Sequence, residues 1–510
     1  MTPGVRLTGP STTRLPVGFA IKLDRRTRRL DGGSALLGGS PGRLVRLAPA
    51  ARRLLDQRGG SLVVRDATGA ALARRLLDAG LANPLPDQLP GTPAPAGVTV
   101  VVPVRDRPVG LRRLLAALAA TTAGLAQVIV VDDGSQNEVA CRVVAKAAGA
   151  RLLRHPRSLG PAAARNTGLA AATTPVVAFL DSDVVPTAGW LAPLLAHLAD
   201  PAVALVAPRI VGLPTSKPGW LARYEGLRSA LDLGSDPAPV LPRSRVAYVP
   251  SAALVVRRVG VGAGFDPSMP VAEDVDLGLR LREAGWRLRY EPSATVAHEH
   301  RDRFLDWWTR KAFYGTGAAP LALAHPGAVP PAVLAPWTAA ACVLAVWQRP
   351  CGLVAAVLIT AFAVGRLRRV LSGGSGSEDP RSGDPGLAAP MPLALRLAGT
   401  GLLGAAVQCA SLLTRHWWPL TVLACLVSRR ARRAALAAAL AEGAWDWWTH
   451  RPPRGRLGLD PVRYVLAHRL DDLGYGAGLW WGAYRRRIVA PLLPMITWRK
   501  TSNVDMSRVR

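Results

Sequence analysis

Three stretches decide the fold: VTVVVPVRD at residues 98–106, VIVVDDGS at residues 128–135 and VVAFLDSD at residues 176–183. Each begins as a nearly continuous run of β-branched and other apolar residues, which is typical of strands buried on both faces of a parallel sheet. Patterns with helical spacing follow at residues 111–121, 139–147 and 162–172. This alternation of strands and helices predicts a doubly wound α/β domain.

At the end of each of these apolar runs lie residues that are, except for one proline, charged. They are Pro103, Arg105, Asp106, Asp132, Asp133, Asp181 and Asp183. In open parallel sheets, ligands bind beyond the carboxyl ends of the strands. A hard divalent cation such as Mg²⁺ or Mn²⁺ binds one or two carboxylates together with phosphate oxygens and water. The sequence therefore predicts a pocket for a metal ion and a nucleotide sugar at this edge of the sheet.

A second acidic group, Glu273, Asp274 and Asp276, begins a helix that is predicted to continue to residue 284. Acids stabilise the N-terminus of a helix, so a purely structural role is one interpretation. The other is that one of these carboxylates is a general base for an acceptor hydroxyl. His298 follows a strand-like run at residues 294–297. A lone histidine is commonly structural, but beside two aspartates it becomes a candidate metal ligand.

Composition narrows the class of protein. The chain has 510 residues, 49% of them hydrophobic, and a formal charge of +30. This length corresponds to about three domains, and the composition excludes a disordered chain, a collagen-like repeat and a disulfide scaffold. The five cysteines are scattered without a CxxC pair, which argues against structural zinc. The basic excess suits a nucleoside diphosphate, an anionic lipid or a nucleic acid.

The flanks predict additional units. Residues 1–90 contain helical patterns at 44–55 and 66–77 and a strand-like run at 61–64, and a proline-rich linker follows at 83–97. Residues 302–445 contain two apolar pairs, 331–365 and 397–427, separated by a Gly/Ser/acidic loop at 372–386. Arginines border both pairs, which predicts membrane hairpins with cytoplasmic ends; buried alanine-rich helices of a soluble protein are the alternative. Residues 446–510 are predicted to be a C-terminal tail.

The beginning of the chain bears on localisation. Residues 1–29 contain no apolar segment of the kind found in a secretory signal. We therefore expect the catalytic part on the cytoplasmic side of the cell membrane.

A family resemblance adds to these expectations. The motifs VVVPVRD, VIVVDDGS, ARNTGLAAA, FLDSDVVP, AEDVDLGLRLREAGW and YEPSATVAH, over residues 97–301, resemble inverting family-2 glycosyltransferases. This resemblance implies a GT-A fold, the Rossmann-like nucleotide-diphospho-sugar transferase domain. It implies that Asp106 and Asp132 contact the nucleotide and that Arg165 faces the donor. It also implies that Asp181 and Asp183 form the DxD pair, with Asp183 and His298 as metal ligands and Asp274 as the catalytic base.

The flanks also resemble the glycosyltransferase family of the mycofactocin system, through GGSPGRLVRL near the start and LDDLGYGAGLWWGAYRRR near the end. This implies transfer of a hexose, glucose, from UDP-glucose to the peptide-derived redox cofactor mycofactocin or its precursor. The stretch from LLDQRGG to LLDAGLANP resembles PqqD-like winged-helix units that bind peptides. We therefore interpret residues 1–90 as an acceptor-binding unit.

Two other functions would account for parts of this sequence. A cell-wall or lipid-linked polysaccharide glycosyltransferase would share every core residue and differ only in its acceptor. A winged-helix nucleic-acid binder with a vestigial catalytic domain would need aromatic side chains that stack on bases. Residues 1–95 contain one aromatic residue, Phe19. The complete acidic motifs also argue against a vestigial enzyme, so no nucleic-acid partner is expected.

Overall fold

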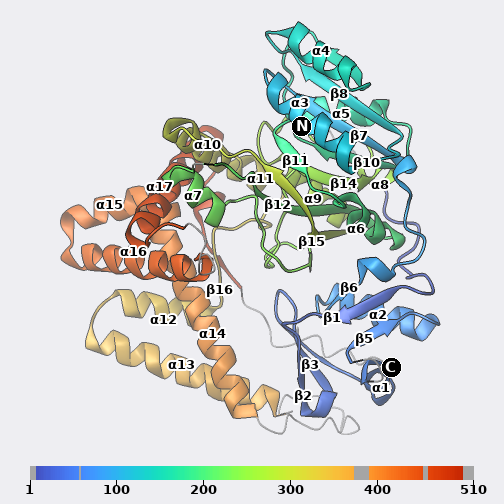
Figure 1. Cartoon of the computed structure of the whole chain (residues 1–510). Coiled ribbons are helices and arrows are strands. Elements are labelled where there is room, and N and C mark those ends of the chain that lie inside the picture. Colours follow the sequence, from blue (N-terminus) through green and yellow to red (C-terminus); the bar gives the residue numbers. More distant parts are fainter. Residues whose placement is uncertain (1–6, 57–58, 217, 373–389, 452–457, 498–510) are drawn as a thin grey trace. The chain divides into compact units, whose positions relative to one another are not determined.

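The computed structural model describes residues 7–56, 59–216, 218–372, 390–451 and 458–497 (Figure 1). Backbone contacts divide the chain into two units. The first comprises residues 1–28 and 36–303, and the second comprises residues 29–35 and 304–507. The first unit contains all the motifs at the strand ends, and the second contains the apolar helices.

A nine-stranded sheet forms the centre of the first unit. Its order is β11-β15-β12-β14-β10-β7-β8-β9, and β13 pairs with β15. The strands are β7 (Val98–Val104), β8 (Gln127–Asp133), β9 (Arg151–His155), β10 (Val176–Leu180), β11 (Val184–Pro186), β12 (Val203–Gly212), β13 (Ala238–Pro239), β14 (Ala253–Arg257) and β15 (Arg287–His298). The helices are α3 (Pro108–Thr121), α4 (Glu138–Ala147), α5 (Pro161–Ala171), α6 (Leu191–Ala196), α7 (Trp220–Leu227), α8 (Arg258–Val261), α9 (Glu273–Glu283) and the short η4 (His197–Ala199).

Strand direction decides which residues meet. β7 pairs in parallel with β8 and β10, whereas β14 is antiparallel to both β10 and β12. β12 and β15 are parallel to each other. The carboxyl ends of β7, β8, β10, β12 and β15 therefore lie along one edge of the sheet. The predicted α/β alternation is confirmed, with antiparallel β14 inserted into the otherwise parallel central strands.

Alternation along β7 produces two apolar cores. Val100 and Val102 pack on one face of the sheet with Leu111 of α3, and Val101 packs on the other face with Ala164 of α5. All three valines are fully buried. Helix α5 lies close to β7, because a Cβ on Gly168 would come within 2.2 Å of the Val101 side chain. Glycine is therefore required in the ARNTG segment for packing.

The N-terminal part of the first unit is a small α+β domain. It contains β1 (Ala20–Leu23), β3 (Ala35–Gly38), β4 (Arg43–Arg46), β5 (Ser61–Val63), β6 (Ala82–Pro84), α1 (Pro49–Asp56), α2 (Ala67–Asp78) and the short turns η2 (Pro86–Gln88) and η3 (Pro95–Gly97). β2 (Arg28–Leu30) and the turn η1 (Asp31–Gly33) fall almost entirely within residues 29–35, which belong to the second unit. Strands β5, β1 and β6 form an antiparallel sheet. The helix predicted over 44–55 begins only at Pro49, because proline suits a first helical position and the preceding residues form β4.

The second unit is helical. It contains α10 (Phe304–Thr316), α11 (Ala318–Ala324), α12 (Pro336–Val346), α13 (Pro350–Leu371), α14 (Pro390–Ser411), a π-helical turn η5 (Leu412–His416), α15 (Trp418–Val427), α16 (Arg429–His450), α17 (Pro461–Arg486), η6 (Ala490–Leu492), β16 (Val333–Leu334) and β17 (Met495–Ile496). The boundary predicted at residue 445 falls inside α16, and the predicted tail contains the long helix α17. The loop predicted over 372–386 lies, after residue 372, outside the described residues.

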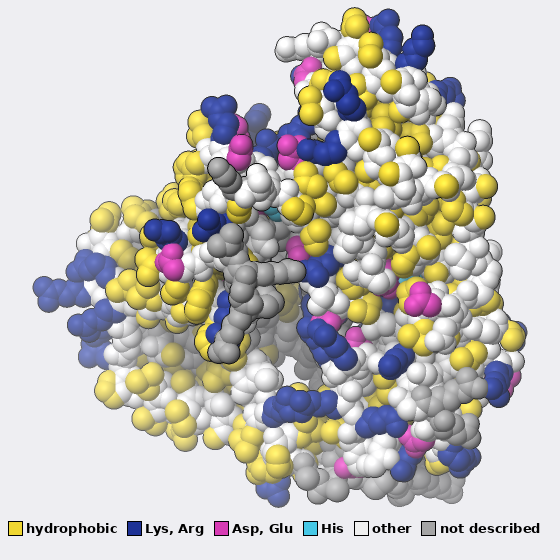
Figure 2. Space-filling view, viewed as in Figure 1, with side chains coloured by type: hydrophobic (Ala, Val, Ile, Leu, Met, Phe, Trp, Pro, Cys, Tyr) yellow, Lys and Arg dark blue, Asp and Glu magenta, His cyan; other side chains and the backbone are white. Residues whose placement is uncertain are grey.

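Two helices of this unit have the length and composition to cross a membrane. They are Pro350–Leu371, with mean hydropathy 1.9, and Pro390–His416, with mean hydropathy 1.4. On α13, the side chains of Val357 and Phe362 are each 67% exposed. Many apolar side chains are visible on the surface of the helical region, with basic side chains among them (Figure 2).

Candidate active site

The strand ends bring Asp183 and His298 together. β11 pairs with the end of β15, with Val184 opposite His298. The Nε2 atom of His298 lies 3.6 Å from Oδ1 of Asp183. The other carboxylate oxygen of Asp183 accepts a hydrogen bond from Arg107 at 3.0 Å. The two predicted metal ligands are therefore adjacent, although 115 positions separate them in the sequence.

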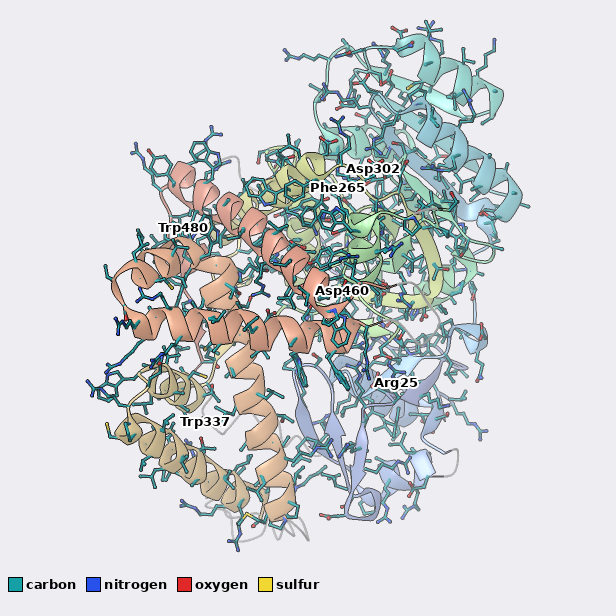
Figure 3. The ribbon with its side chains drawn as sticks, turned by 60° about the vertical axis from the view of Figure 1, so that its left-hand side comes forward. Arg25, Phe265, Asp302, Trp337, Asp460 and Trp480 are labelled. Carbon is teal, nitrogen blue, oxygen red and sulfur yellow. The ribbon has the colours of Figure 1, made fainter. Side chains whose placement is uncertain are left out.

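Arg165 connects the end of β10 to the start of α9. Its guanidinium donates to Asp181 Oδ1 at 2.7 Å and to Glu273 Oε1 at 2.8 Å. The residue is 2% exposed, and its guanidinium lies 5.3 Å from the ring centre of Phe265, which is labelled in Figure 3. Burial, together with the neighbouring Asp183, raises the pKa of Asp181 despite the opposing effect of Arg165.

Asp274 stands beside this network at the N-terminus of α9. Its Oδ2 atom accepts from the backbone N–H of Ser251 at 2.9 Å, and Oδ1 accepts from that of Val275 at 2.8 Å. Burial and the negative charge of Glu273 raise the pKa of Asp274 to about 6. The preceding residue, Ala272, has a left-handed φ of 68°, a conformation that is strained for alanine. The backbone thus holds this carboxylate in place, and with a pKa of about 6 the group is half protonated near pH 6 and mostly ionised at neutral pH.

The two acids at the end of β8 have hydrogen-bond partners for their carboxylate oxygens. Asp132 is fully buried and accepts from the Ser135 backbone N–H and from Arg154. Asp133 accepts from His155 and Ser158, each at 2.7 Å, and from the backbone of the loop at residues 159–160. Burial alone would raise the pKa of Asp133, but these hydrogen bonds lower it. Both aspartates therefore fix the loops that surround the site, and a direct contact with the donor stays a prediction.

The residues after β7 are more accessible. Asp106 has a left-handed φ of 54°. Its Oδ1 atom accepts from the Gln136 backbone N–H at 2.7 Å, and its own N–H donates to Ser135 Oγ at 2.9 Å. The side chain of Arg105 is 57% exposed and donates to Ser158 at 3.0 Å. Pro103 lies within β7, opposite Val131 of β8. The segment therefore presents a carboxylate and a guanidinium beside the Asp183 site.

Comparison with known proteins identifies the family. The sequence profile described as "Glycosyl transferase family 2" matches residues 99–255, which include the ends of β7, β8 and β10. The pre-mycofactocin glycosyltransferase of Mycobacterium tuberculosis is 49% identical over 500 residues, covering 95% of this chain and 99% of the relative. The chain belongs to the pre-mycofactocin glycosyltransferases of family 2. It is therefore a glycosyltransferase, and its α/β domain has the GT-A fold.

More distant relatives match only parts of this glycosyltransferase. The human probable polypeptide N-acetylgalactosaminyltransferase 8 is 30% identical over 168 residues, covering 30% of this chain and 26% of the relative. A Pyrobaculum calidifontis mannosyltransferase, solved with GDP-Man and Mn²⁺, is 19% identical with a TM-score of 0.41, covering 77% of this chain and 90% of that one. GalNAc-T7, solved with UDP, GalNAc and Mn²⁺, is 18% identical with a TM-score of 0.33, covering 40% and 43%.

The side chains around Asp183 suit a divalent cation. Oδ1 of Asp183 is buried and lacks a hydrogen-bond partner among the described residues, and Nε2 of His298 is the ring nitrogen near it. A carboxylate and an imidazole 3.6 Å apart could ligate one ion, and the second aspartate of the DSD motif adds negative charge. The donor set of this glycosyltransferase therefore fits Mg²⁺ or Mn²⁺, and ligation by Asp183 and His298 stays a prediction.

Sequence reasoning missed some residues of the site. Arg107 pairs with Asp183, and the signal for it was its place in PVRDRP at the end of β7. Ser251 anchors Asp274 through a backbone N–H, which no residue-type pattern reveals. Arg165 lies between Asp181 and Glu273, two partners that its motif did not indicate, and its expected place facing the donor stays a prediction.

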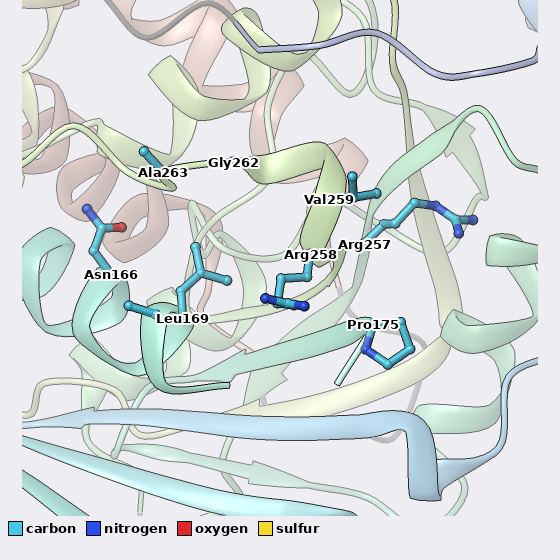
Figure 4. A pocket seen from close by; sticks show the side chains of 9 residues that line it. Asn166, Leu169, Pro175, Arg257, Arg258, Val259, Gly262 and Ala263 are labelled. Carbon is cyan, nitrogen blue, oxygen red and sulfur yellow. The ribbon is translucent and has the colours of Figure 1, made fainter. Parts of the chain in front are cut away.

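A cavity lies away from these carboxylates. It has a volume of about 490 Å³, and its lining includes Asn166, Pro175, Arg257 and Arg258 (Figure 4). Arg257 pairs with Val176, the first residue of β10, so the cavity lies at the edge opposite Asp181. Asn166 exchanges hydrogen bonds with the Phe265 backbone, and Arg257 donates to backbone carbonyls. Few polar groups are left to recognise a ligand there.

A second group of potential metal ligands lies in the helical unit. Glu442, His468 and Asp472 bring their ligand atoms within 4.8 Å of one another. Arg469 pairs with both carboxylates, and Arg415 donates to Asp472 at 3.0 Å. Because guanidinium groups already neutralise these acids, we interpret the group as an ion-pair network that joins α16 and α17.

Proposed function

We propose that this glycosyltransferase moves a hexose, glucose, from UDP-glucose to a peptide-derived acceptor of the pre-mycofactocin type, with inversion at the anomeric carbon. The observation that carries the proposal is Asp274, whose pKa is raised to about 6. A general base works best when its pKa lies near the working pH. Asp274 also lies next to Glu273, which Arg165 ties to the DSD motif.

The reaction is a single displacement at the anomeric carbon. The acceptor hydroxyl oxygen forms a bond to this carbon as its proton passes to a carboxylate oxygen of Asp274. The bond from the carbon to the diphosphate oxygen breaks, and the electron pair leaves with the nucleoside diphosphate. One displacement converts an α-linked donor into a β-linked product, through an oxocarbenium-like transition state.

Positive groups stabilise the departing diphosphate. Arg105 and Arg107 follow β7, and their side chains are 57% and 39% exposed. Negative charge grows on the leaving oxygen in the transition state, and prearranged cations lower the energy of that state. A divalent ion held by Asp183 and His298 would neutralise the diphosphate as a Lewis acid. Asp106 and Asp181 are proposed to contact the nucleotide and the sugar.

The acceptor is proposed from the relative. The Mycobacterium tuberculosis protein with 49% identity is named for pre-mycofactocin, and the alignment covers both flanks of the catalytic domain. Residues 1–90, which we interpret as a winged-helix-like, PqqD-like unit, are proposed to help bind the peptide part. The alternative acceptor is a lipid-linked or cell-wall saccharide, which the exposed apolar helices α13 and α14 would suit.

We also propose that these helices hold the enzyme on the cell membrane, with the catalytic domain on the cytoplasmic side. Few side chains of the two helices are buried: 6% of the apolar window of Pro350–Leu371 and 17% of that of Pro390–His416. Apolar surface of this extent is stabilised by lipid. Arg366, Arg368 and Arg369 end α13 and suit anionic headgroups.

The test is a donor and acceptor panel with the purified full-length protein. Nucleotide sugars that differ in base and in hexose are incubated with pre-mycofactocin or with a polyprenyl-linked saccharide, in the presence of Mn²⁺. We expect the mass of one hexose unit to be added to pre-mycofactocin, with a β-anomeric proton signal in the NMR spectrum of the product. An α-anomeric product would refute inversion. Transfer only to the lipid-linked saccharide would refute the proposed acceptor.

A further inference from the structure

Residues 247–249 lie beside Asp274 and follow a turn that contacts the N-terminal domain. A narrow cavity, with about 10 Å³ of free space, is lined on one side by Asp274 and Val275 and on the other by residues 247–249. Pro250 joins these residues to Ser251, whose backbone N–H donates to Asp274. Tyr248 is 38% exposed, so it presents an aromatic surface at the rim. An acceptor hydroxyl that approaches Asp274 from this side would contact this segment.

The segment is held through Arg245. A turn over residues 241–246 is closed by the hydrogen bond from Leu241 N–H to the Val246 carbonyl oxygen at 3.0 Å. Arg245, in this turn, pairs with Asp236 at 3.2 Å and donates to the Pro237 carbonyl oxygen at 3.0 Å. Its backbone N–H donates to Ser40 Oγ of the N-terminal domain at 2.7 Å.

Asp236 links this turn of the catalytic domain to the N-terminal domain. The residue is 4% exposed, and its carboxylate pairs with Arg25 and Arg26 of the N-terminal domain as well as with Arg245. Arg25 is labelled in Figure 3. One buried carboxylate therefore bridges three guanidinium groups from two domains, with one negative charge among three positive ones. Without it, the three cations would repel one another and the turn would lose its attachment.

We propose that Asp236 is a positioning residue through which the N-terminal domain sets the acceptor side of the active site. It holds the turn at residues 241–246, and the turn aligns Tyr248 and its neighbours against Asp274. This inference rests on the proposed function, because it assumes that the acceptor reaches Asp274. The donor side does not depend on Asp236, since Asp106, Asp181 and Asp183 are fixed by other partners.

The chain offers a matched control for this contact. Asp78 of α2 pairs with Arg287 of β15 at 2.6 and 2.7 Å, so it also joins the N-terminal domain to the catalytic domain. Arg287 begins β15, whereas His298 ends it. The Asp78 contact therefore lies at the edge of the sheet opposite the site. Loss of either contact weakens the attachment of the domain, but only loss of Asp236 should affect the acceptor.

The experiment compares Asp236→Asn, the double variant Arg25→Gln with Arg26→Gln, and Asp78→Asn in the full-length enzyme. Initial rates of transfer to pre-mycofactocin give the acceptor KM and kcat, hydrolysis of UDP-glucose by water reports on the donor side, and thermal unfolding reports on stability. We expect Asp236→Asn and the arginine double variant to raise the acceptor KM about tenfold, or ~1.4 kcal/mol. Donor hydrolysis should stay at the wild-type rate, and Asp78→Asn should leave the acceptor KM unchanged.

Two results would overturn the inference. One is an acceptor KM that stays at the wild-type value in Asp236→Asn, and the other is an equal rise in Asp78→Asn. If Asp236→Asn unfolds, the acceptor KM is taken from the arginine double variant, which keeps the Asp236 carboxylate. Failure of the proposed function would be distinct, because then the wild-type enzyme itself would not glycosylate pre-mycofactocin.

Discussion

Replacement of Glu273 by glutamine should lower the pKa of Asp274 and shift the pH dependence of transfer. The negative charge of Glu273 is one of the two causes that raise this pKa to about 6; the other is burial. Removing a unit charge from this adjacent buried residue should change the pKa by at least about 1 unit, or ~1.4 kcal/mol. Loss of Glu273 also leaves Arg165 less neutralised, which acts in the same direction.

The assay is kcat measured across about pH 5 to 8 with saturating donor and acceptor. A base must be deprotonated to work, so wild-type turnover should rise with pH through about 6 and then level off. In Glu273→Gln this rise should move to about pH 5. Asp276→Asn is the control, because Asp276 pairs with Arg280 further along the same helix. A rise that stays near pH 6 in Glu273→Gln, or moves upward, would refute the reasoning.

Three other perturbations test separate parts of the structure. Asp183→Asn should weaken Mn²⁺ binding at least about tenfold in calorimetry and abolish transfer, because it removes a charged ligand; wild-type transfer in EDTA would contradict this. Arg165→Met should lower the free energy of unfolding in urea by about 3 kcal/mol, since it removes the guanidinium partner of the buried Glu273 and of the partly buried Asp181; a loss below about 1 kcal/mol would argue against the network. Val357→Glu combined with Phe362→Glu should move the enzyme from the membrane to the soluble fraction, since charges are costly in lipid; unchanged sedimentation would favour a soluble role for α13.

The ends of the central strands could be predicted because burial on both faces leaves a simple record in the sequence. Val98–Val104 and Val176–Leu180 are apolar along almost their whole length, and the acids begin where burial ends. Order along the chain and strand direction then bring the carboxylates to one edge. This reasoning located Asp183 and His298, which the structure brings within 3.6 Å of each other.

Strands that depart from this pattern were missed. β12 contains Pro208, which lacks a backbone donor, and the pairing with β15 is irregular between Pro208 and Arg209. β9 has the sequence RLLRH, in which charged residues flank a short apolar pair. Neither stretch indicates a strand by itself, because tertiary pairing supplies the missing stability.

Several charge pairs of the site could not be predicted from the sequence, because their partners are far apart along the chain. Asp236 meets Arg25 and Arg26, more than 200 positions earlier, and no local spacing predicts this. Arg165 lies in a motif that points to the donor by resemblance, yet its two acidic partners come from β10 and α9. A sequence pattern gives the residue types at a site, whereas the pairing of charges depends on how the elements pack.

Substitution of Asp274 tests the central claim most directly. Asn keeps the volume of the side chain but cannot accept the proton, so transfer of hexose to pre-mycofactocin should fall by about 10²–10⁴ in kcat. Binding of UDP-glucose, measured by calorimetry with Mn²⁺, should match that of the wild type, and Asp276→Asn should keep its activity. An Asp274→Asn enzyme that retains more than about a tenth of wild-type turnover would contradict the assignment of Asp274 as the base.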